Sequence, residues 1–175
     1  LKEARRIIQV YRAANFAINN LWVRASSTIE YMQRGDTLQF GREGVLRVEA
    51  KNNAIVLPSG LAMFYHDLYV VKGERGPEYA YKTRRGSKRI YGGKVVENVC
   101  QAIARCIIGH QMLLIAKRYK VVLTVHDSIV VCVQDSEVDE ARKYVELCMS
   151  QTPYWAEGLP ITCESGTGKS YGECE

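Results

Sequence analysis

Two short runs of apolar, mostly β-branched residues, 121–125 and 129–133, flank the polar triplet His126-Asp127-Ser128. Their restricted χ1 angles disfavour a helix, and each run has the length of a buried strand. Because Asp and Ser are common turn residues, the sequence predicts a β-hairpin with His-Asp-Ser at its tip. There the Asp127 carboxylate would lie at the mouth of an apolar sheet, where an unpaired charge is unfavourable unless a cation, usually a divalent metal, compensates it.

A turn needs no function to contain Asp and Ser, so a purely structural hairpin is the alternative. His126 favours a functional site, because its titratable ring adds little to a turn but can form hydrogen bonds with a phosphate or a sugar. A second pair, His66-Asp67, is a rival metal site. It is the weaker one, since Tyr65 and Tyr69 alternate around it as in a half-exposed strand. The residues alone leave a structural turn and a metal site both open.

The chain has 175 residues, enough for one domain with a buried core. It begins with leucine and runs directly into an apolar-periodic segment, so we expect a piece of a longer protein. No stretch approaches the roughly 18 uninterrupted apolar residues of a membrane span, and no signal peptide is visible. We therefore expect a soluble chain with no membrane partner. The six cysteines form no C-x-x-C pair and are expected to be reduced.

Basic residues outnumber acidic ones by 24 to 19, a net charge of +5. Six of them lie within thirteen positions: Lys82, Arg84, Arg85, Lys88, Arg89 and Lys94. Segment 72–89 combines Gly, Pro and several of these bases without periodicity, which predicts a loop. A solvated charge run is the simplest explanation, but such a cluster also suits the phosphates of a nucleic acid.

The N-terminal part of the chain changes its pattern once. Apolar residues at spacings of three and four predict one amphipathic helix from residue 3 to about 34, ending near Gly35. Strand patterns follow at 45–48, 55–57 and 61–71, with a turn at Pro58-Ser59-Gly60. We interpret this part as a helix followed by a small antiparallel sheet.

A long helix is predicted from Val95 to about Arg118, with an apolar stripe for the core. A polar line runs along its first half at spacings of four, three and four: Lys94, Asn98, Gln101 and Arg105. The line carries amides and bases, which form hydrogen bonds with base edges and sugars in a minor groove. An ordinary solvated helix face is the alternative.

The C-terminal part is predicted to contain one more helix and one more strand. Ser136, followed by acidic residues, is the expected N-cap of an amphipathic helix, and 161–164 is the expected strand. Residues 166–170 resemble the end of a phosphate-binding loop, but the motif needs a glycine where Cys163 stands, so we reject it. The chain is therefore predicted to be α+β, an antiparallel sheet with a central His-Asp hairpin, backed by long amphipathic helices.

The whole set of motifs resembles the C-terminal part of a family A (DNA polymerase I type) DNA polymerase, especially the phage enzymes. The resemblance covers nearly all 175 residues. Val125-His126-Asp127 between apolar strands matches the third catalytic motif of that family. The other matching elements are Tyr91-Gly92-Gly93-Lys94, Glu97-Asn98, Gln101-Ala102, Leu57-Pro58-Ser59-Gly60 and the tail 153–172. The resemblance implies a palm subdomain formed by residues 1–175, with a helix at 1–34 leading in from the fingers and the remainder of the polymerase absent.

The resemblance also implies roles for individual residues. Asp127 would be catalytic and bind Mg²⁺, and His126 would contact the primer terminus. The chain departs from the family at Ser128, where a second carboxylate normally follows. Together with the basic cluster and the polar line, this gives the residues expected to bind DNA: Arg84, Arg85, Lys88, Arg89, Tyr91, Lys94, Asn98, Gln101 and His126.

The implied activity is template-directed DNA synthesis with two Mg²⁺ ions in the complete enzyme, which requires carboxylates that hold both ions about 4 Å apart. The second metal-binding aspartate and the helix that holds the deoxynucleoside triphosphate lie upstream in this family, and no stretch here matches them. The chain alone is therefore expected to be inactive, to bind primer-template DNA, and to be cytoplasmic, in the host if phage-encoded. Alternatives are a metal-dependent nuclease or phosphohydrolase using both His-Asp pairs, and a noncatalytic duplex-binding module.

Overall fold

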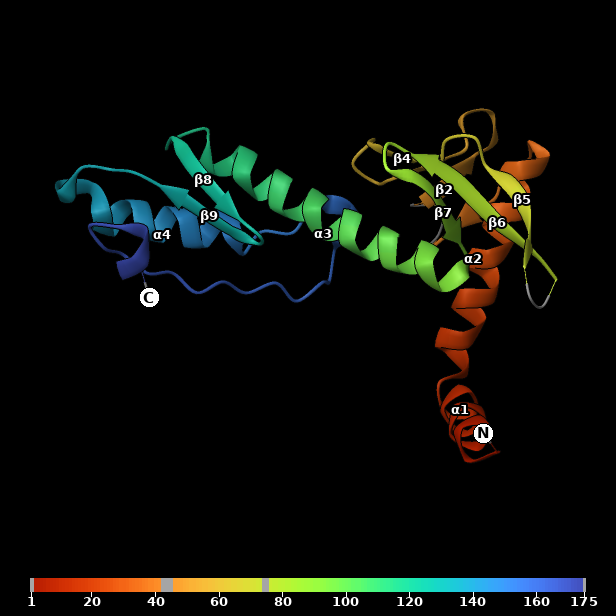
Figure 1. The fold of residues 1–175 in the computed structure, drawn as a ribbon. Helices are drawn as coiled ribbons and strands as arrows, with labels where there is room; N and C mark the ends of the chain where they lie inside the picture. The colour runs from red at the N-terminus through yellow and green to blue at the C-terminus, as the bar shows by residue number, and fades with distance from the viewer. Residues whose placement is uncertain (1, 42–45, 74–75, 175) are drawn as a thin grey trace. The chain divides into compact units, whose positions relative to one another are not determined.

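The computed structural model describes residues 2–41, 46–73 and 76–174, which belong to two compact units, 1–102 and 103–175 (Figure 1). Helices and antiparallel sheets occur in the chain, so the predicted α+β class is confirmed. The strands of the described residues form three separate sheets, and the His-Asp hairpin is a two-stranded sheet of its own, not the centre of a larger one.

The predicted N-terminal helix is two helices, α1 (Lys2–Ala14) and α2 (Phe16–Arg34). Asn15 separates them: its backbone N–H and its side-chain Nδ2 both donate to the Tyr11 carbonyl at 2.9 Å. A short polar side chain that competes for a backbone carbonyl disfavours continuation of a helix. The prediction of one continuous helix was wrong, but its end at Gly35, in the left-handed conformation at φ 85°, is confirmed.

The first sheet has the order β1-β2-β3-β4 and consists of β1 (Gln39–Phe40), β2 (Leu46–Glu49), β3 (Ala54–Val56) and β4 (Ala62–Phe64). A 3₁₀ turn (Ala50–Asn52) joins β2 to β3, and the predicted Pro58-Ser59-Gly60 turn joins β3 to β4. The predicted strands at 45–48 and 55–57 correspond to β2 and β3, although residue 45 lies outside the described residues. Helix α2 contacts β1 and β2, and the buried residues of these three elements belong to the core of unit 1.

The second sheet, β5-β6-β7, overturns the prediction of a loop at 72–89. It consists of β5 (Tyr69–Gly73), β6 (Gly76–Thr83) and β7 (Gly86–Ile90). Most residues of β6 and β7 are charged, polar or glycine, so their alternation could not be seen as an apolar pattern; backbone pairing, with register Ala80 opposite Arg89, makes them strands. The interpretation of Tyr65 as part of a half-exposed strand was also wrong, because it lies between β4 and β5 and is 2% exposed.

Helix α3 (Gly92–Ile115) begins and ends three residues before the predicted limits. Its first residue explains how it packs in unit 1: a Cβ on Gly92 would lie 2.0 Å from the carbonyl oxygen of Trp22 on α2. The Gly92 N–H also donates to Ser26 Oγ at 3.1 Å. By length and composition α3 could span a membrane, a criterion that core helices of soluble proteins also meet.

Unit 2 contains the end of α3, the hairpin of β8 (Val121–Val125) and β9 (Ser128–Val131), and α4 (Val138–Met149). Its core is formed by Ile115, Tyr119, Ala141 and Cys148. Ile129 and Val131 of β9 pack against this core, so one face of the hairpin covers α4. Gln111 of α3 is buried and donates to the carbonyls of Met149 and Gln151, which ties α3 to the end of α4.

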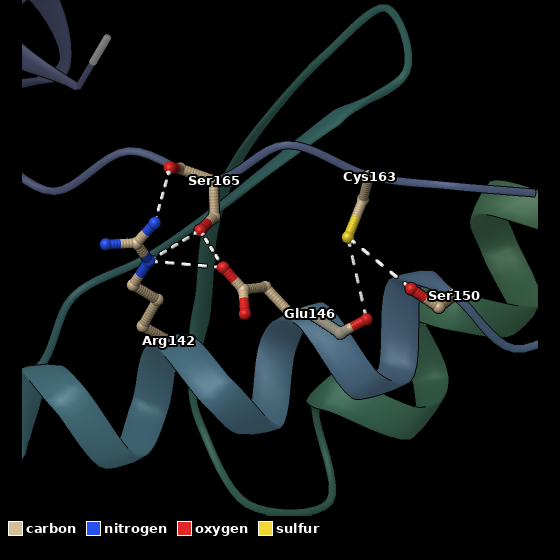
Figure 2. Close-up of polar contacts among 5 residues, drawn as sticks. All are labelled: Arg142, Glu146, Ser150, Cys163 and Ser165. Carbon is tan, nitrogen blue, oxygen red and sulfur yellow. Dashed lines mark hydrogen bonds and ion pairs between the residues drawn. The ribbon is translucent and has the colours of Figure 1, made fainter.

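Two predictions for the C-terminal part were wrong. Ser136 lies inside a 3₁₀ turn (Asp135–Glu137) that precedes α4 and is not its N-cap. Residues 161–164 form no strand. They belong instead to an irregular tail that side-chain contacts hold against α4 (Figure 2). Arg142 donates to Ser165 Oγ at 2.8 Å, and Cys163 donates to the Glu146 carbonyl at 3.5 Å. These side-chain contacts take the place of strand pairing.

Candidate functional site

The tip of the hairpin consists of two residues, His126 and Asp127. Val125 pairs with Ser128, so Ser128 begins β9 and is not part of the tip. His126 has φ 52°, in the left-handed region that favours glycine. Most residues other than glycine carry a strain of about 1 to 3 kcal/mol in this region, histidine and aspartate enter it more often than most, and such conformations cluster at functional sites. The tip thus holds an unfavourable backbone conformation next to the candidate carboxylate.

The tip is exposed to solvent, which corrects the predicted environment of Asp127. All three residues of the triplet are exposed. On β8, Val122 is 50% and Leu123 is 45% exposed, so in unit 2 the hairpin buries only one face. The argument that burial in an apolar sheet obliges a cation to compensate the carboxylate therefore fails. An exposed carboxylate can bind a cation but does not require one for stability.

The donor set around Asp127 fits one ligand position of a hard cation. In the described part of the chain no group of three or more His, Cys, Asp or Glu side chains could hold a metal ion. The Asp127 carboxylate forms no hydrogen bond or ion pair with any described residue. The residue that follows it in the sequence, Ser128, offers only a hydroxyl group. Mg²⁺ commonly binds one or two carboxylates and completes its octahedron with waters and substrate oxygens. Asp127 suits that role, but it does not form a complete site.

The rival pair, His66-Asp67, lies in unit 1 and is engaged in other contacts. Asp67 forms an ion pair with Lys82 at 3.1 Å, and the His66 ring stacks on Phe64 with a centroid distance of 5.6 Å. Asp67 has a left-handed backbone at φ 47°, which Asp tolerates better than most residues. A carboxylate already paired with lysine is a poor metal ligand, so these contacts weigh against a second metal site.

The basic cluster divides into paired and unpaired cations. Lys82, Arg89 and Lys94 form ion pairs with Asp67, Glu78 and Glu97, at 3.1, 2.8 and 2.7 Å. The hydrogen bond to Glu97 raises the pKa of Lys94. Arg84 and Arg85 lie at the turn between β6 and β7, and Lys88 lies on β7; all three are exposed and have no acidic partner within the described residues. These three cations are therefore the ones available to an external phosphate.

Arg89 and Tyr91 were both predicted to bind DNA, and both line a hollow of about 480 Å³ in unit 1. The other walls come from α2 and β6, including Glu30 and Glu78. Because Arg89 binds Glu78 on the wall of this hollow, it belongs to a local ion pair and differs from the unpaired cations.

The polar line on α3 is partly in unit 1 and partly in unit 2. Lys94, Asn98 and Gln101 belong to unit 1, whereas Arg105 belongs to unit 2. Gln101 is exposed and Asn98 is half-buried. Asn98 Nδ2 donates to the phenol oxygen of Tyr65 at 3.2 Å, so the line is not simply a solvated face.

Two tyrosines that were not predicted to be binding residues lie between Lys88 of the β6–β7 hairpin and the polar line. The rings of Tyr65 and Tyr81 pack edge to face with a centroid distance of 5.1 Å. Tyr81 lies on β6 opposite Lys88 of β7. Burial raises the pKa of Tyr65, and the hydrogen bond from Asn98 opposes this effect, so Tyr65 is a neutral phenol at physiological pH. Lys88, Tyr81, Tyr65 and Asn98 thus form one row from the β6–β7 hairpin to α3, which we call the hairpin–helix surface; Tyr65 is its buried member.

Comparisons with known proteins give one informative similarity. The chain is 33% identical over 180 aligned residues to a protein named DNA polymerase from Bacillus phage SP02. The alignment covers 93% of this chain and 26% of the phage protein, so the chain spans about a quarter of the length of this curated relative. No family model matches the chain, and no solved structure matches it. The sequence is therefore similar, along nearly its whole length, to one part of a phage DNA polymerase.

Proposed function

We propose that this chain is the palm part of a family A DNA polymerase and takes part in template-directed DNA synthesis. The observation that carries the proposal is the 33% identity to a phage DNA polymerase across 93% of the chain. Its partners would be primer-template DNA and, through residues outside this chain, deoxynucleoside triphosphates. The place of action would be the cytoplasm, that of the host if the gene belongs to a phage.

Asp127 would contribute one ligand to a catalytic Mg²⁺ ion in this proposal. In nucleotidyl transfer, paired Mg²⁺ ions lower the pKa of the attacking hydroxyl and stabilise the leaving pyrophosphate. Asp127 suits the role because it is exposed, at a hairpin tip, and without a partner among the described residues. His126 would donate a hydrogen bond to the primer terminus, and its fixed backbone limits where its ring can lie. Ser128 supplies no charge, so further carboxylates must come from elsewhere.

The hairpin–helix surface and its neighbours would hold the DNA. Arg84, Arg85 and Lys88 would bind phosphates, because they are exposed and lack acidic partners in the described ranges. Asn98 and Gln101 would contact the minor groove. A polymerase must accept every correct base pair, and only the minor groove offers acceptors at similar positions for all of them.

A noncatalytic duplex-binding module would use the same surface and differs only in what Asp127 does. A nuclease using both His-Asp pairs has less support, since Asp67 is paired with Lys82. Binding of a divalent ion at Asp127 therefore separates the proposal from its nearest alternative.

The DNA part of the proposal can be tested with modified duplexes. We expect the chain to bind a primer-template in fluorescence anisotropy, and to bind less tightly when 3-deazapurines remove the minor-groove N3 acceptors. Replacement by 7-deazapurines removes major-groove N7 acceptors instead and should leave the affinity unchanged. Equal weakening with both modified duplexes, or no binding to the unmodified duplex, would contradict the proposal.

The metal part can be tested with Mn²⁺ as a paramagnetic substitute for Mg²⁺. In NMR spectra, low concentrations of Mn²⁺ should broaden the amide resonances of residues 126–128, and Asp127→Ala should abolish this effect. Asp67→Ala is the matched control and should leave the broadening at the tip unchanged. Broadening that persists in Asp127→Ala would mean that this carboxylate is not a ligand.

A further inference from the structure

Tyr65 combines deep burial with a polar contact to a residue of the polar line. It lies between β4 and β5, is 2% exposed, and accepts a hydrogen bond from Asn98 Nδ2 at 3.2 Å. Its ring is held by the edge-to-face contact with Tyr81. The phenol oxygen therefore has a fixed position, set by packing on residues of the second sheet.

The contact restricts Asn98 in a specific way. An asparagine amide has two donor hydrogens and one acceptor oxygen, and on a helix surface it can adopt several rotamers. The bond to Tyr65 uses one donor hydrogen and selects the rotamer that reaches the buried phenol. The other hydrogen and the carbonyl oxygen remain for a ligand, at a place determined by Tyr65. A ligand then binds a side chain that is already ordered, which reduces the entropic cost of binding.

We infer that Tyr65 is a positioning residue that fixes the amide of Asn98 for contact with the minor groove of DNA. This inference rests on the proposed function, because it assumes that Asn98 contacts DNA. Tyr65 itself is too buried to touch the duplex. Its hydroxyl, and not its ring, carries the role, so phenylalanine should keep the packing and remove the effect.

A double-mutant cycle tests the inference in the full 175-residue chain. The affinity for a primer-template duplex is measured for the unmodified chain, Tyr65→Phe, Asn98→Ala and the double variant. Tyr65→Phe should weaken binding about two- to tenfold, the range expected for one hydrogen bond. In the Asn98→Ala background the same change should have no further effect. The slope of log affinity against log salt should stay constant, because neither residue is charged.

Tyr119→Phe is the matched control, since it removes the hydroxyl of another buried tyrosine, one in the core of unit 2 that forms no hydrogen bond with a described residue, and it should leave the affinity unchanged. A second measurement uses the unmodified chain alone and does not depend on how a variant folds. The order parameter of the Asn98 side-chain amide should be typical of a rigid group, above about 0.6, and that of exposed Gln101 should be lower.

Three results would overturn the inference. If Tyr65→Phe weakens binding equally with and without Asn98, tyrosine acts through the fold and not through the amide. If Asn98→Ala weakens binding and Tyr65→Phe does not, or if the Asn98 amide is as mobile as that of Gln101, the positioning role fails while the proposed function stands. If the unmodified chain binds no DNA, the proposed function fails and the inference fails with it.

Discussion

Gly92→Ala should strongly destabilise unit 1, because the first residue of α3 has no room for a side chain. A Cβ would lie 2.0 Å from the Trp22 carbonyl oxygen, 2.4 Å from Ser26 Oγ and 2.8 Å from the Ser26 nitrogen. Two of these are backbone atoms of α2, which cannot rotate away. Reaching even 3.0 Å from the carbonyl requires a shift of 3.0 minus 2.0, or 1.0 Å, and so breaks the 3.1 Å hydrogen bond from Gly92 to Ser26.

The cost can be estimated from two contributions. Overpacking costs about 1 to 3 kcal/mol, and breaking the hydrogen bond costs about 1 kcal/mol, so Gly92→Ala should lower the free energy of unfolding by about 2 to 4 kcal/mol. For a chain of this size that corresponds to a decrease in Tm of about 4 to 15 °C. Trp22 lies in the affected unit, and in a Trp155→Phe background its fluorescence reports unit 1 alone.

Two other glycines of α3 are matched controls. At Gly93 the nearest atom to a Cβ is a Tyr91 ring carbon at 3.3 Å, and that ring is exposed and can move, so Gly93→Ala should change stability by less than about 1 kcal/mol. At Gly109 nothing lies within 4 Å, and Gly109→Ala should stabilise the helix by about 0.5 to 1 kcal/mol. If Gly92→Ala unfolds at the same temperature as Gly93→Ala, the close packing of α3 on α2 is refuted.

Four further outcomes are expected. Hydrogen bonds from Ser165 and Arg142 lower the pKa of Glu146. Their stabilising effect is therefore complete above the ordinary pKa of 4.5 and disappears as the pH falls through the lower pKa of the folded state. The difference in denaturation midpoint between the unmodified chain and Glu146→Gln should accordingly shrink below about pH 4.5. Replacing the unpaired cations Arg84, Arg85 and Lys88 by alanine should lower the slope of log affinity for DNA against log salt by roughly one for each phosphate that is no longer neutralised. Arg89→Ala should change this slope less. Primer extension by the isolated chain should not exceed that of an Asp127→Ala control, and activity above that control would show that the chain holds a complete catalytic centre. Replacing His126 by glycine should raise the free energy of unfolding by about 1 kcal/mol, measured by denaturation, and an unchanged or lower value would mean that the left-handed backbone carries no strain.

The sequence predicted those elements whose apolar periodicity is independent of distant contacts. The hairpin around residues 126–127, the long helix α3 and the end of α2 at Gly35 all follow from local patterns and turn residues. The strands β6 and β7 did not, because their solvent-facing residues are charged and the backbone pairing that defines them is tertiary. The break at Asn15 was missed because a single side-chain hydrogen bond to a backbone carbonyl leaves the periodicity unchanged.

The candidate DNA-binding residues were predicted by type, but the type could not show which cations are free. Arg89 and Arg84 look equivalent in the sequence, and only the register of β6 and β7 places Glu78 beside the first of them. Likewise, the contact between Asn98 and Tyr65 joins residues 33 positions apart. Such contacts depend on how the second sheet packs within unit 1, which no local pattern encodes.

The two His-Asp pairs share a left-handed residue but differ in the pairing of their carboxylates. A two-residue hairpin loop usually places glycine or asparagine where φ is positive, and at the tip this position holds His126 at φ 52°, a residue type that also enters this region more often than most. At the other pair the left-handed residue is Asp67, a type that tolerates this conformation, and its charge is balanced by Lys82. Both pairs therefore have one residue in the left-handed region, and they differ in the carboxylate: that of Asp127 is exposed and unpaired, judged over the described residues, whereas that of Asp67 is paired. Since a carboxylate without a protein partner is available to a cation, the hairpin tip is the better candidate for chemistry.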